Sequence, residues 1–249
     1  MILHDARNPR SVAGYDALTR RLTEDLPDDL AIVIGGDGFM LHCIAAHGLD
    51  RTYLGLNAGH LGFLLNAVDD WDAVANRIRS GAWSSQAFPL IHATAQTRDG
   101  EVLTKHAIND VYLERMTGQT ARLSLTIDDH PVVSKMVTDG IIFCTALGST
   151  AYSFSAGGTP CHPLVPVIGV TPICPHLPRL SPFILPETAV AVVEVESAEH
   201  RPVRAVVDGA GADYIERLTV RIAKEKVRFA YFDSRDLTAT MLSKIVRRA

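Results

Sequence analysis

The stretch Leu30-Ala31-Ile32-Val33-Ile34-Gly35-Gly36-Asp37-Gly38 decides the fold prediction for this chain. Its first five residues are apolar without polar alternation, which is typical of a strand covered on both faces of a parallel sheet. The segment from Phe39 to His47 is predicted as a helix. Glycines let the backbone approach a bulky anion, and the free amides of a helix N-terminus favour phosphate. The stretch therefore predicts a phosphate loop between a strand and a helix.

Asp37 is the unusual residue of this loop. A carboxylate repels phosphate unless it holds a metal ion or takes a proton from a nucleophile, and phosphoryl transfer needs both functions. Taken alone, however, the tetrapeptide fits an ordinary strand-to-helix turn equally well.

The composition narrows the class of protein. The chain has 249 residues, of which 47% are hydrophobic and 21% charged, as expected for a globular protein that is not embedded in a membrane. Its net charge of −4 argues against nucleic acid as a partner. We find no signal-peptide pattern and no apolar run long enough to cross a bilayer. The four cysteines form no disulfide framework, so we expect a cytoplasmic protein without membrane contact.

The chain changes character near residue 82. Up to residue 81, predicted helices (11–25, 39–47 and 69–80) alternate with predicted strands (30–34 and 52–56), the pattern of a parallel α/β layer. Beyond it, turn signals separate short β-rich runs, which predict an all-β sandwich over 82–233. Those strands are expected at 90–96, 102–107, 111–114, 121–127, 132–136, 141–145, 165–171, 189–195, 201–207, 218–222 and 227–232. A final helix, 237–248, is expected to return with 234–249 to the first domain, 1–81.

One segment interrupts the β pattern. Residues from Gly148 to Gly158 are small and hydroxylated, and they predict a helical turn with Ser149 as its cap. Hydroxyl groups beside glycine supply neutral donors and acceptors for a sugar or a base edge.

Several short motifs follow one another along the chain from about residue 30 to 210. These are G-G-D-G at 35–38, N-x-G-x-L-G-F-L at 57–64, Asn109-Asp110, the long signature from Asp139-Gly140 to Gly158, T-P-I-C-P-H at 171–176, and Asp208-Gly209. In this order the motifs resemble those of the NAD kinases, and the short start of the chain resembles a compact bacterial member.

The resemblance implies that ATP, or polyphosphate, phosphorylates the adenosine ribose 2′-hydroxyl of NAD with Mg²⁺ or another divalent cation. It implies Asp37 as the catalytic base and Gly35, Gly36 and Gly38 as the cradle of the donor phosphates. It also implies a homodimer or homotetramer that binds small-molecule nucleotides. The residues implied at the nucleotides are Asn57, Phe63, Asn109, Asp110, Asp139, Thr150, Ala151, Tyr152, Ser155 and Asp208.

For several of these residues a structural role stays open. Asp139 and Asp208 also fit turns, whereas Phe63 and Tyr152 also fit a packed core. Departures from the family pattern put affinity and donor preference in question: Phe39 replaces Thr, Ala146-Leu147 replaces Pro-Thr, Asp110 is one methylene shorter than the usual Glu, and 177–182 differs.

Three alternatives were weighed against this interpretation. A lipid kinase of the diacylglycerol or sphingosine type shares the G-G-D-G loop, and a non-catalytic NAD(P)-binding regulator could use the same scaffold. A P-loop ATPase is excluded because the chain has no G-x-x-x-x-G-K-[ST] run. Cys161-His162 and Cys174-x-His176 fit no standard zinc spacing, so we expect no protein-bound metal there.

Overall fold

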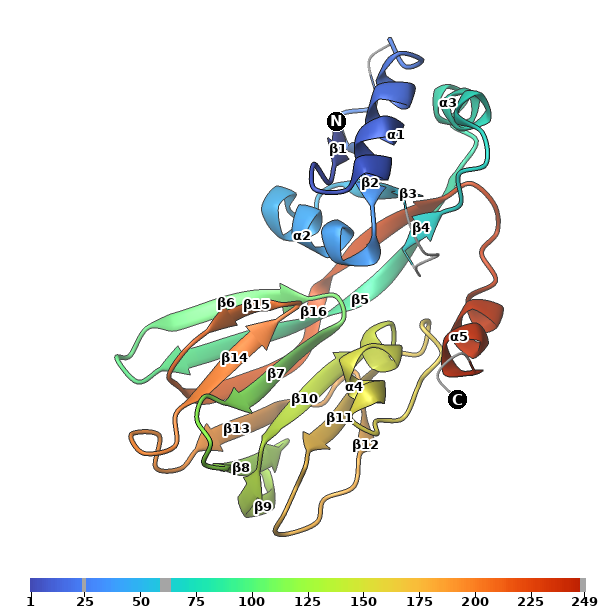
Figure 1. The fold of residues 1–249 in the computed structure, drawn as a ribbon. Helices are drawn as coiled ribbons and strands as arrows, with labels where there is room; N and C mark the ends of the chain where they lie inside the picture. Colours follow the sequence, from blue (N-terminus) through green and yellow to red (C-terminus); the bar gives the residue numbers. More distant parts are fainter. Residues whose placement is uncertain (24–25, 59–63, 247–249) are drawn as a thin grey trace. The chain divides into compact units, whose positions relative to one another are not determined.

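The computed structural model describes residues 1–23, 26–58 and 64–246. The chain forms two compact units (Figure 1): Met1–Phe88 with Lys226–Thr240, and Pro89–Glu225 with the end of the chain from Met241. Two long strands, β5 (Ser84–Thr97) and β16 (Ile215–Tyr231), have residues in both units. Each unit has its own hydrophobic core.

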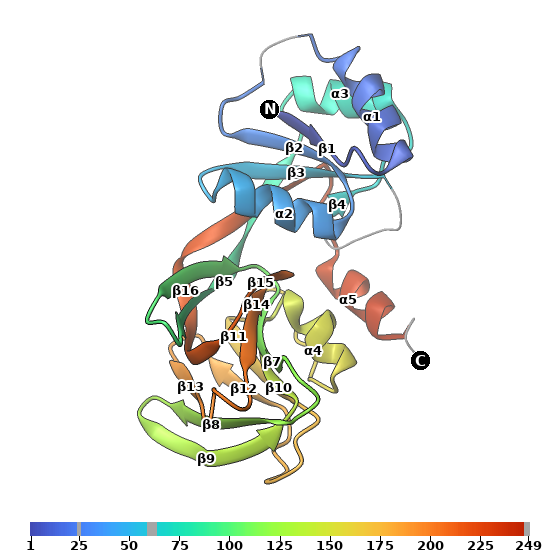
Figure 2. The same ribbon diagram turned by 60° about the vertical axis from the view of Figure 1, so that its left-hand side comes forward.

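The first unit is a parallel sheet with helices on both faces, as predicted (Figure 2). Its strands are β1 (Ile2–His4), β2 (Leu30–Gly35), β3 (Thr52–Asn57) and the end of β16, paired in that order. The helices α1 (Pro9–Thr19) and α3 (Trp71–Arg79) lie on one face, and α2 (Asp37–His47) lies on the other. Every residue of β2 is buried, which is the arrangement that its unbroken apolar run predicts.

The ends of the helices differ from the prediction. The helix α1 begins at Pro9 instead of at 11, and Asn8 is its N-cap. The hydroxyl of Ser11, which lies inside the helix, is buried; it accepts from Asp5 N and donates to Ile34 O. The helix also ends at Thr19 instead of 25. In α3, Asp70 accepts from Asp72 N and Ala73 N, so the acid that begins this segment acts as an N-cap.

The buried side-chain amide of Asn66 stabilises the point where the strand paired with β3 changes from β16 to β4 (Leu65–Asn66). The short strand β4 pairs with the end of β3, whereas β16 pairs with its beginning. Asn66 Nδ2 donates to Gly55 O at 2.9 Å and to Ala230 O at 3.0 Å, and its Oδ1 accepts from Phe232 N at 2.9 Å. Asn66 therefore links three segments of the first unit.

The second unit is the predicted β-sandwich, because one core receives side chains from two sheets. One sheet has the order β12-β11-β10-β7-β14-β15, and in the other β16 continues through β13, β8 and β9. In the second sheet, β5 pairs with β16 and β6. The bounds are β6 (Val102–Ala107), β7 (Asp110–Arg115), β8 (Ala121–Ile127), β9 (His130–Thr138), β10 (Gly140–Thr145), β11 (Val167–Ile173), β12 (Phe183–Pro186), β13 (Ala191–Val195), β14 (Val203–Val207) and β15 (Ala210–Ala212).

Local assignments in the second half of the chain also change. The two strands predicted at 218–222 and 227–232 are one continuous strand, β16, while β12 and β15 were not predicted. The helical turn after β10 consists of a 3₁₀ turn, η1 (Gly148–Thr150), and α4 (Tyr152–Ser155). Ser149 does not cap it, because its hydroxyl donates to Ala146 O and accepts from Cys161 N. The last helix is α5 (Leu237–Val246), and in the described parts of the chain no helix has the length and apolar character of a membrane span.

Candidate active site

The carboxyl ends of the parallel strands bring the phosphate loop together with other segments of the first unit. Gly35 at the end of β2 pairs in register with Asn57 at the end of β3, and His4 at the end of β1 pairs with Ile34. The chain that leaves β1 stays bound to this edge, since Asp5 N donates to Ile34 O at 3.2 Å. In open α/β sheets, ligands bind at this edge.

The phosphate loop leaves room on one side and packs tightly on the other. A Cβ atom added at Gly35 would lie 2.8 Å from Phe39 Cδ1, so the residue that replaces the family's Thr packs against the loop itself. Added Cβ atoms at Gly36 and Gly38 would meet nothing within 4 Å. The N-cap of α2 is Gly36, which has no side chain to bind the first-turn amides, and this leaves the positive end of the helix dipole for an anion.

Asp37 is the first residue of α2 and is half-buried. Its Oδ1 accepts a hydrogen bond from Leu64 N at 3.2 Å, which fixes the carboxylate beside the loop. Asp37 also interacts electrostatically with Tyr231 and Arg235. These two residues lie at and after the end of β16, and the parallel pairing of β16 with β3 brings them to this edge of the sheet. Burial lowers the pKa of Arg235, while the neighbouring Tyr231 and Asp37 oppose that effect.

Tyr231 and Arg235 were not predicted as site residues. The guanidinium of Arg235 lies 5.3 Å from the centre of the Tyr231 ring and donates to Leu65 O. The hydroxyl of Tyr231 is buried and has no hydrogen-bond partner among the residues that the structure describes. Their position depends on strand pairing between distant parts of the chain, so no local signal could have revealed them.

A hollow of about 420 Å³ lies beside the phosphate loop within the first unit. One wall is the start of α2, and the other is the segment after β1, which was also not predicted. Arg7 in that segment is largely exposed and pairs with Asp5 at 3.1 Å. The lining residues are His4, Asp5, Ala6, Arg7, Gly38, Phe39 and His42.

In the second unit, Asn109 and Asp110 form a turn that leads into β7. The carboxylate of Asp208, in the turn between β14 and β15, accepts hydrogen bonds from three consecutive amides of this turn. The distances are 2.6 Å from Ile108 N, 2.9 Å from Asn109 N and 3.2 Å from Asp110 N. Asp208 thus contacts the predicted nucleotide residues through their backbone.

Asp110 itself is buried, with 6% of its surface exposed. Burial raises the pKa of its carboxyl group to about 7, and the neighbouring Asp208 contributes in the same direction. Tyr112 and Tyr152 stand nearby with their ring centres 5.0 Å apart and their planes at 73°. The pair forms an aromatic edge beside a carboxyl group that changes charge near neutral pH.

The other predicted residues of the second unit lie in two places. Thr150 is buried in η1, whereas Tyr152 and Ser155 are exposed on α4 and Ala151 is half-buried between them. Asp139 lies in the turn between β9 and β10, where it pairs with Arg115 at 2.6 Å. Its charge reaches Tyr152, so it belongs to the same region. In the first unit, Asn57 ends β3, and Phe63 lies outside the described residues.

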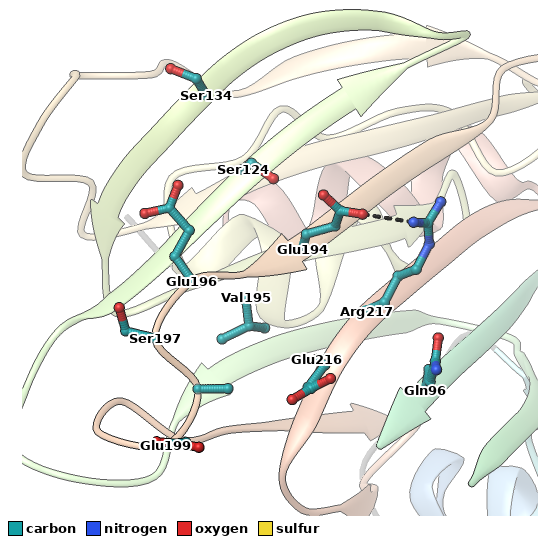
Figure 3. Close-up of a pocket in the computed structure, with 11 residues that line it drawn as sticks. Gln96, Ser124, Ser134, Glu194, Val195, Glu196, Ser197, Glu199, Glu216 and Arg217 are labelled. Atoms are coloured by element: carbon teal, nitrogen blue, oxygen red, sulfur yellow. Dashed lines mark hydrogen bonds and ion pairs between the residues drawn. The ribbon is translucent and has the colours of Figure 1, made fainter. Parts of the chain in front are cut away.

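A larger hollow, of about 720 Å³, lies on the second unit away from all these residues (Figure 3). Four glutamates line it, and one of them, Glu194, pairs with Arg217 at 2.6 Å. Glu196, Glu199 and Glu216 leave an excess of negative charge. Such a surface repels the phosphates of a nucleotide, so we do not assign the nucleotide site to it.

Comparison with known proteins defines the family. A family model described as the ATP-NAD kinase C-terminal domain matches residues 108–231. The NAD kinase of Cereibacter sphaeroides is 35% identical over 203 residues, which cover 79% of this chain and 77% of that protein. The chain belongs to the NAD kinase family.

Two solved structures of this family share the fold. Yeast NADH kinase complexed with NADH matches with a TM-score of 0.77 at 26% identity, over 88% of this chain and 66% of that one. An NAD kinase from Archaeoglobus fulgidus in complex with ATP matches with a TM-score of 0.78 over 98% and 97% of the two chains. At 21% identity the second likeness shows the fold alone.

Proposed function

We propose that this chain phosphorylates the adenosine ribose 2′-hydroxyl of NAD with ATP and thereby forms NADP. Membership of the NAD kinase family supports the reaction. The observation that carries the assignment to residues is the position of Asp37, which begins α2 at the carboxyl edge of a parallel sheet, beside a loop with open space at Gly36 and Gly38. A loop of this kind receives phosphates on its amides, and the adjacent carboxylate faces the reacting groups.

In this proposal Asp37 accepts the proton of the 2′-hydroxyl, or orients that hydroxyl, as the phosphoryl group arrives. The hydrogen bond from Leu64 N holds the carboxylate in place. Arg235 supplies positive charge close to Asp37, where the negative charge of the donor accumulates. Arg7, in the wall of the adjoining hollow, supplies a second cation for the donor phosphates.

The donor set fits a divalent cation that is bound together with the donor phosphates. Mg²⁺ typically takes one or two carboxylates and fills its other positions with phosphate oxygens and water. The described residues contain no cluster of three or more His, Cys, Asp or Glu side chains arranged around a metal, whereas Asp37 offers one carboxylate at the phosphate loop. When bound, the ion would offset the charge of ATP, or of polyphosphate as an alternative donor.

The residues that we assign to NAD lie mainly in the second unit. Asn109 and Asp110 offer polar groups at the turn into β7, and Tyr152 offers an aromatic face next to Tyr112. The assignment also includes Asn57, Phe63, Asp139, Thr150, Ala151 and Ser155. We further propose the division of function implied by the sequence, with the donor loop in 1–81 and 234–249 and NAD binding in 82–233, in a cytoplasmic homodimer or homotetramer.

The test is the formation of NADP⁺ from NAD, ATP and Mg²⁺, read with a dehydrogenase that accepts only the phosphorylated form. Asp37→Asn is the decisive variant, and Asp70→Asn is its matched control because asparagine also caps a helix such as α3. We expect turnover from the wild type and the control and none from Asp37→Asn. Near-normal turnover by a folded Asp37→Asn protein would refute its role. NAD binding without turnover, with ATP and with polyphosphate, would favour the regulator.

A further inference from the structure

The turn at Ile108–Asp110 is held from its amide side by one carboxylate. Asp208 Oδ2 accepts from Ile108 N, and Asp208 Oδ1 accepts from both Asn109 N and Asp110 N. The backbone of Asp208 has φ 45°, and the next residue, Gly209, has φ 88°, so a tight turn directs the carboxylate onto these amides. A backbone hydrogen bond in the opposite direction, from Asp208 N to Asp110 O at 3.1 Å, also joins the two turns.

The carbonyl side of the same turn is held by Thr145, which is fully buried at the end of β10. Its Oγ1 donates to Ile108 O at 2.7 Å and accepts from Gly148 N at 3.0 Å. Its backbone N donates to Asn109 O at 2.9 Å. One hydroxyl therefore connects the turn to the start of η1, the segment that continues to Thr150 and Tyr152.

The start of η1 packs so tightly against the Ile108–Asp110 turn that there is no space for a side chain at Gly148. A Cβ atom added at Gly148 would lie 2.0 Å from Asn109 O. Three loops that are far apart in the sequence thus form one assembly, in which side chains of Asp208 and Thr145 bind backbone groups. Both oxygens of Asp208 accept from backbone amides, so three of the roughly four acceptor sites of this carboxylate are used by the turn itself.

We infer that Asp208 and Thr145 are positioning residues, which fix the Ile108–Asp110 turn against η1 so that Asn109, Asp110 and the residues after η1 present one surface to NAD. The inference rests on the proposed function for the identity of the ligand. It replaces the expectation that Asp208 binds the nucleotide itself. The two residues act on opposite sides of the turn, so the loss of either one loosens the same surface.

The charge of Asp208 also affects the pKa of Asp110, which a purely structural role would not do. Asp208 and burial together raise the pKa of Asp110. The other titratable groups that interact with Asp110 are Tyr112, Cys144 and Tyr152, whose pKa values are all raised by burial. These three groups are neutral at pH 5–8, so Asp208 is the neighbour whose charge acts on Asp110. Burial raises the pKa of Asp208 as well, while its hydrogen bonds from Ile108 N, Asn109 N and Asp110 N oppose that rise.

The experiment compares Asp208→Asn with Asp128→Asn in the intact protein. Asp128 is the control, because it also lies in a turn with positive φ (47°) and accepts a hydrogen bond from a backbone amide of a distant segment, Val190 N at 2.8 Å, although it is more exposed than Asp208. Amide hydrogen exchange at Ile108–Asp110 is measured first, since it needs no ligand. The KM for NAD and kcat are then measured between pH 5.5 and 8.5.

We expect Asp208→Asn to expose the three amides to exchange and to raise the KM for NAD about tenfold or more, with kcat within about threefold, because an amide side chain cannot accept as a carboxylate does. We expect the pH at which KM changes to move to lower values. Asp128→Asn should change none of these. Unchanged exchange and unchanged KM in Asp208→Asn would overturn the inference, as would a fall in kcat at unchanged KM, which would make Asp208 a reacting group.

Thr145 keeps the inference testable if Asp208→Asn does not fold. Thr145→Val keeps the shape and removes the hydroxyl, whereas Thr145→Ser keeps the hydroxyl. We expect a raised KM for NAD in the first and near-wild-type values in the second, and equal values in both would overturn the role of the hydroxyl. A wild-type protein without NAD turnover would refute the proposed function, while hydrogen exchange would still decide whether Asp208 and Thr145 hold the turn.

Discussion

The free energy of unfolding should depend on pH through Asp110, and the substitution Asp110→Asn should remove that dependence. The carboxyl group is buried, and its pKa in the folded protein is raised from 3.8 to about 7. An acid with a raised pKa holds its proton more tightly in the folded state than in the unfolded state. Asparagine has a similar shape but no proton to lose in this range.

The sign and size follow from this difference in proton binding. Between about pH 4 and pH 7 the folded protein keeps the proton of Asp110 and the unfolded chain releases it, so the free energy of unfolding falls as pH rises through this window. Above pH 7 both states are ionised and the contribution is constant. A shift of about three pKa units corresponds to at most about 4 kcal/mol lost between pH 4 and pH 8.

Urea unfolding of the wild type and of Asp110→Asn, measured at half-unit steps from pH 4 to pH 8, tests this expectation. Most other titrating groups contribute equally to both proteins, so the difference between the two free energies isolates Asp110. We expect the variant to gain stability relative to the wild type as pH rises, by roughly 2–4 kcal/mol over the range. A difference that stays constant from pH 4 to pH 8 would refute the reasoning, because it would mean that Asp110 ionises freely.

Three further substitutions test other parts of the structure. Gly148→Ala places a Cβ atom 2.0 Å from Asn109 O, so we expect a loss of about 3 kcal/mol by calorimetry and a raised KM for NAD, and an unchanged melting temperature would contradict this packing. Asn66→Ala removes three buried hydrogen bonds and should cost about 2–4 kcal/mol in urea unfolding; a cost below about 1 kcal/mol would show that the amide is dispensable. Tyr231→Phe removes a buried hydroxyl without a described partner, so unfolding should be unchanged or harder by up to about 1 kcal/mol, and a clear loss of stability would show a partner.

The parts of the fold that could be predicted from the sequence depend on local patterns. The unbroken apolar run before Gly35 predicted a buried parallel strand, and the structure confirms it. The prediction of two strands at 218–222 and 227–232 was wrong, because one strand, β16, continues through the polar segment Lys224-Glu225-Lys226. A polar segment tolerates an extended backbone when its side chains reach solvent, as these three do.

The site could be predicted only as a set of separate loops. The order of Gly35, Gly36 and Asp37 is local, so the strand-to-helix turn was predicted from the sequence, although α2 begins at Asp37 instead of at 39. The bonds between Asp208 and the Ile108–Asp110 turn join positions about a hundred residues apart, and β14 must pair with β7 before they can form. Arg235 reaches the neighbourhood of Asp37 for a similar reason, through the pairing of β16 with β3.

Two departures from the family pattern, Leu147 and Asp110, lie in the packing beneath the proposed NAD surface. Leu147 is buried with 4% exposure, so it contributes an apolar side chain where the family's hydroxyl would need a partner. Asp110 is also buried, and a side chain one methylene shorter than Glu keeps its carboxyl group close to the backbone and to Asp208. Burial, together with the charge of Asp208, raises the pKa of Asp110 to about 7, so the group donates a proton below that pH and accepts one above it. NAD affinity should therefore change near neutral pH in this chain, and the pH of that change should fall when Asp208 loses its charge beside the turn.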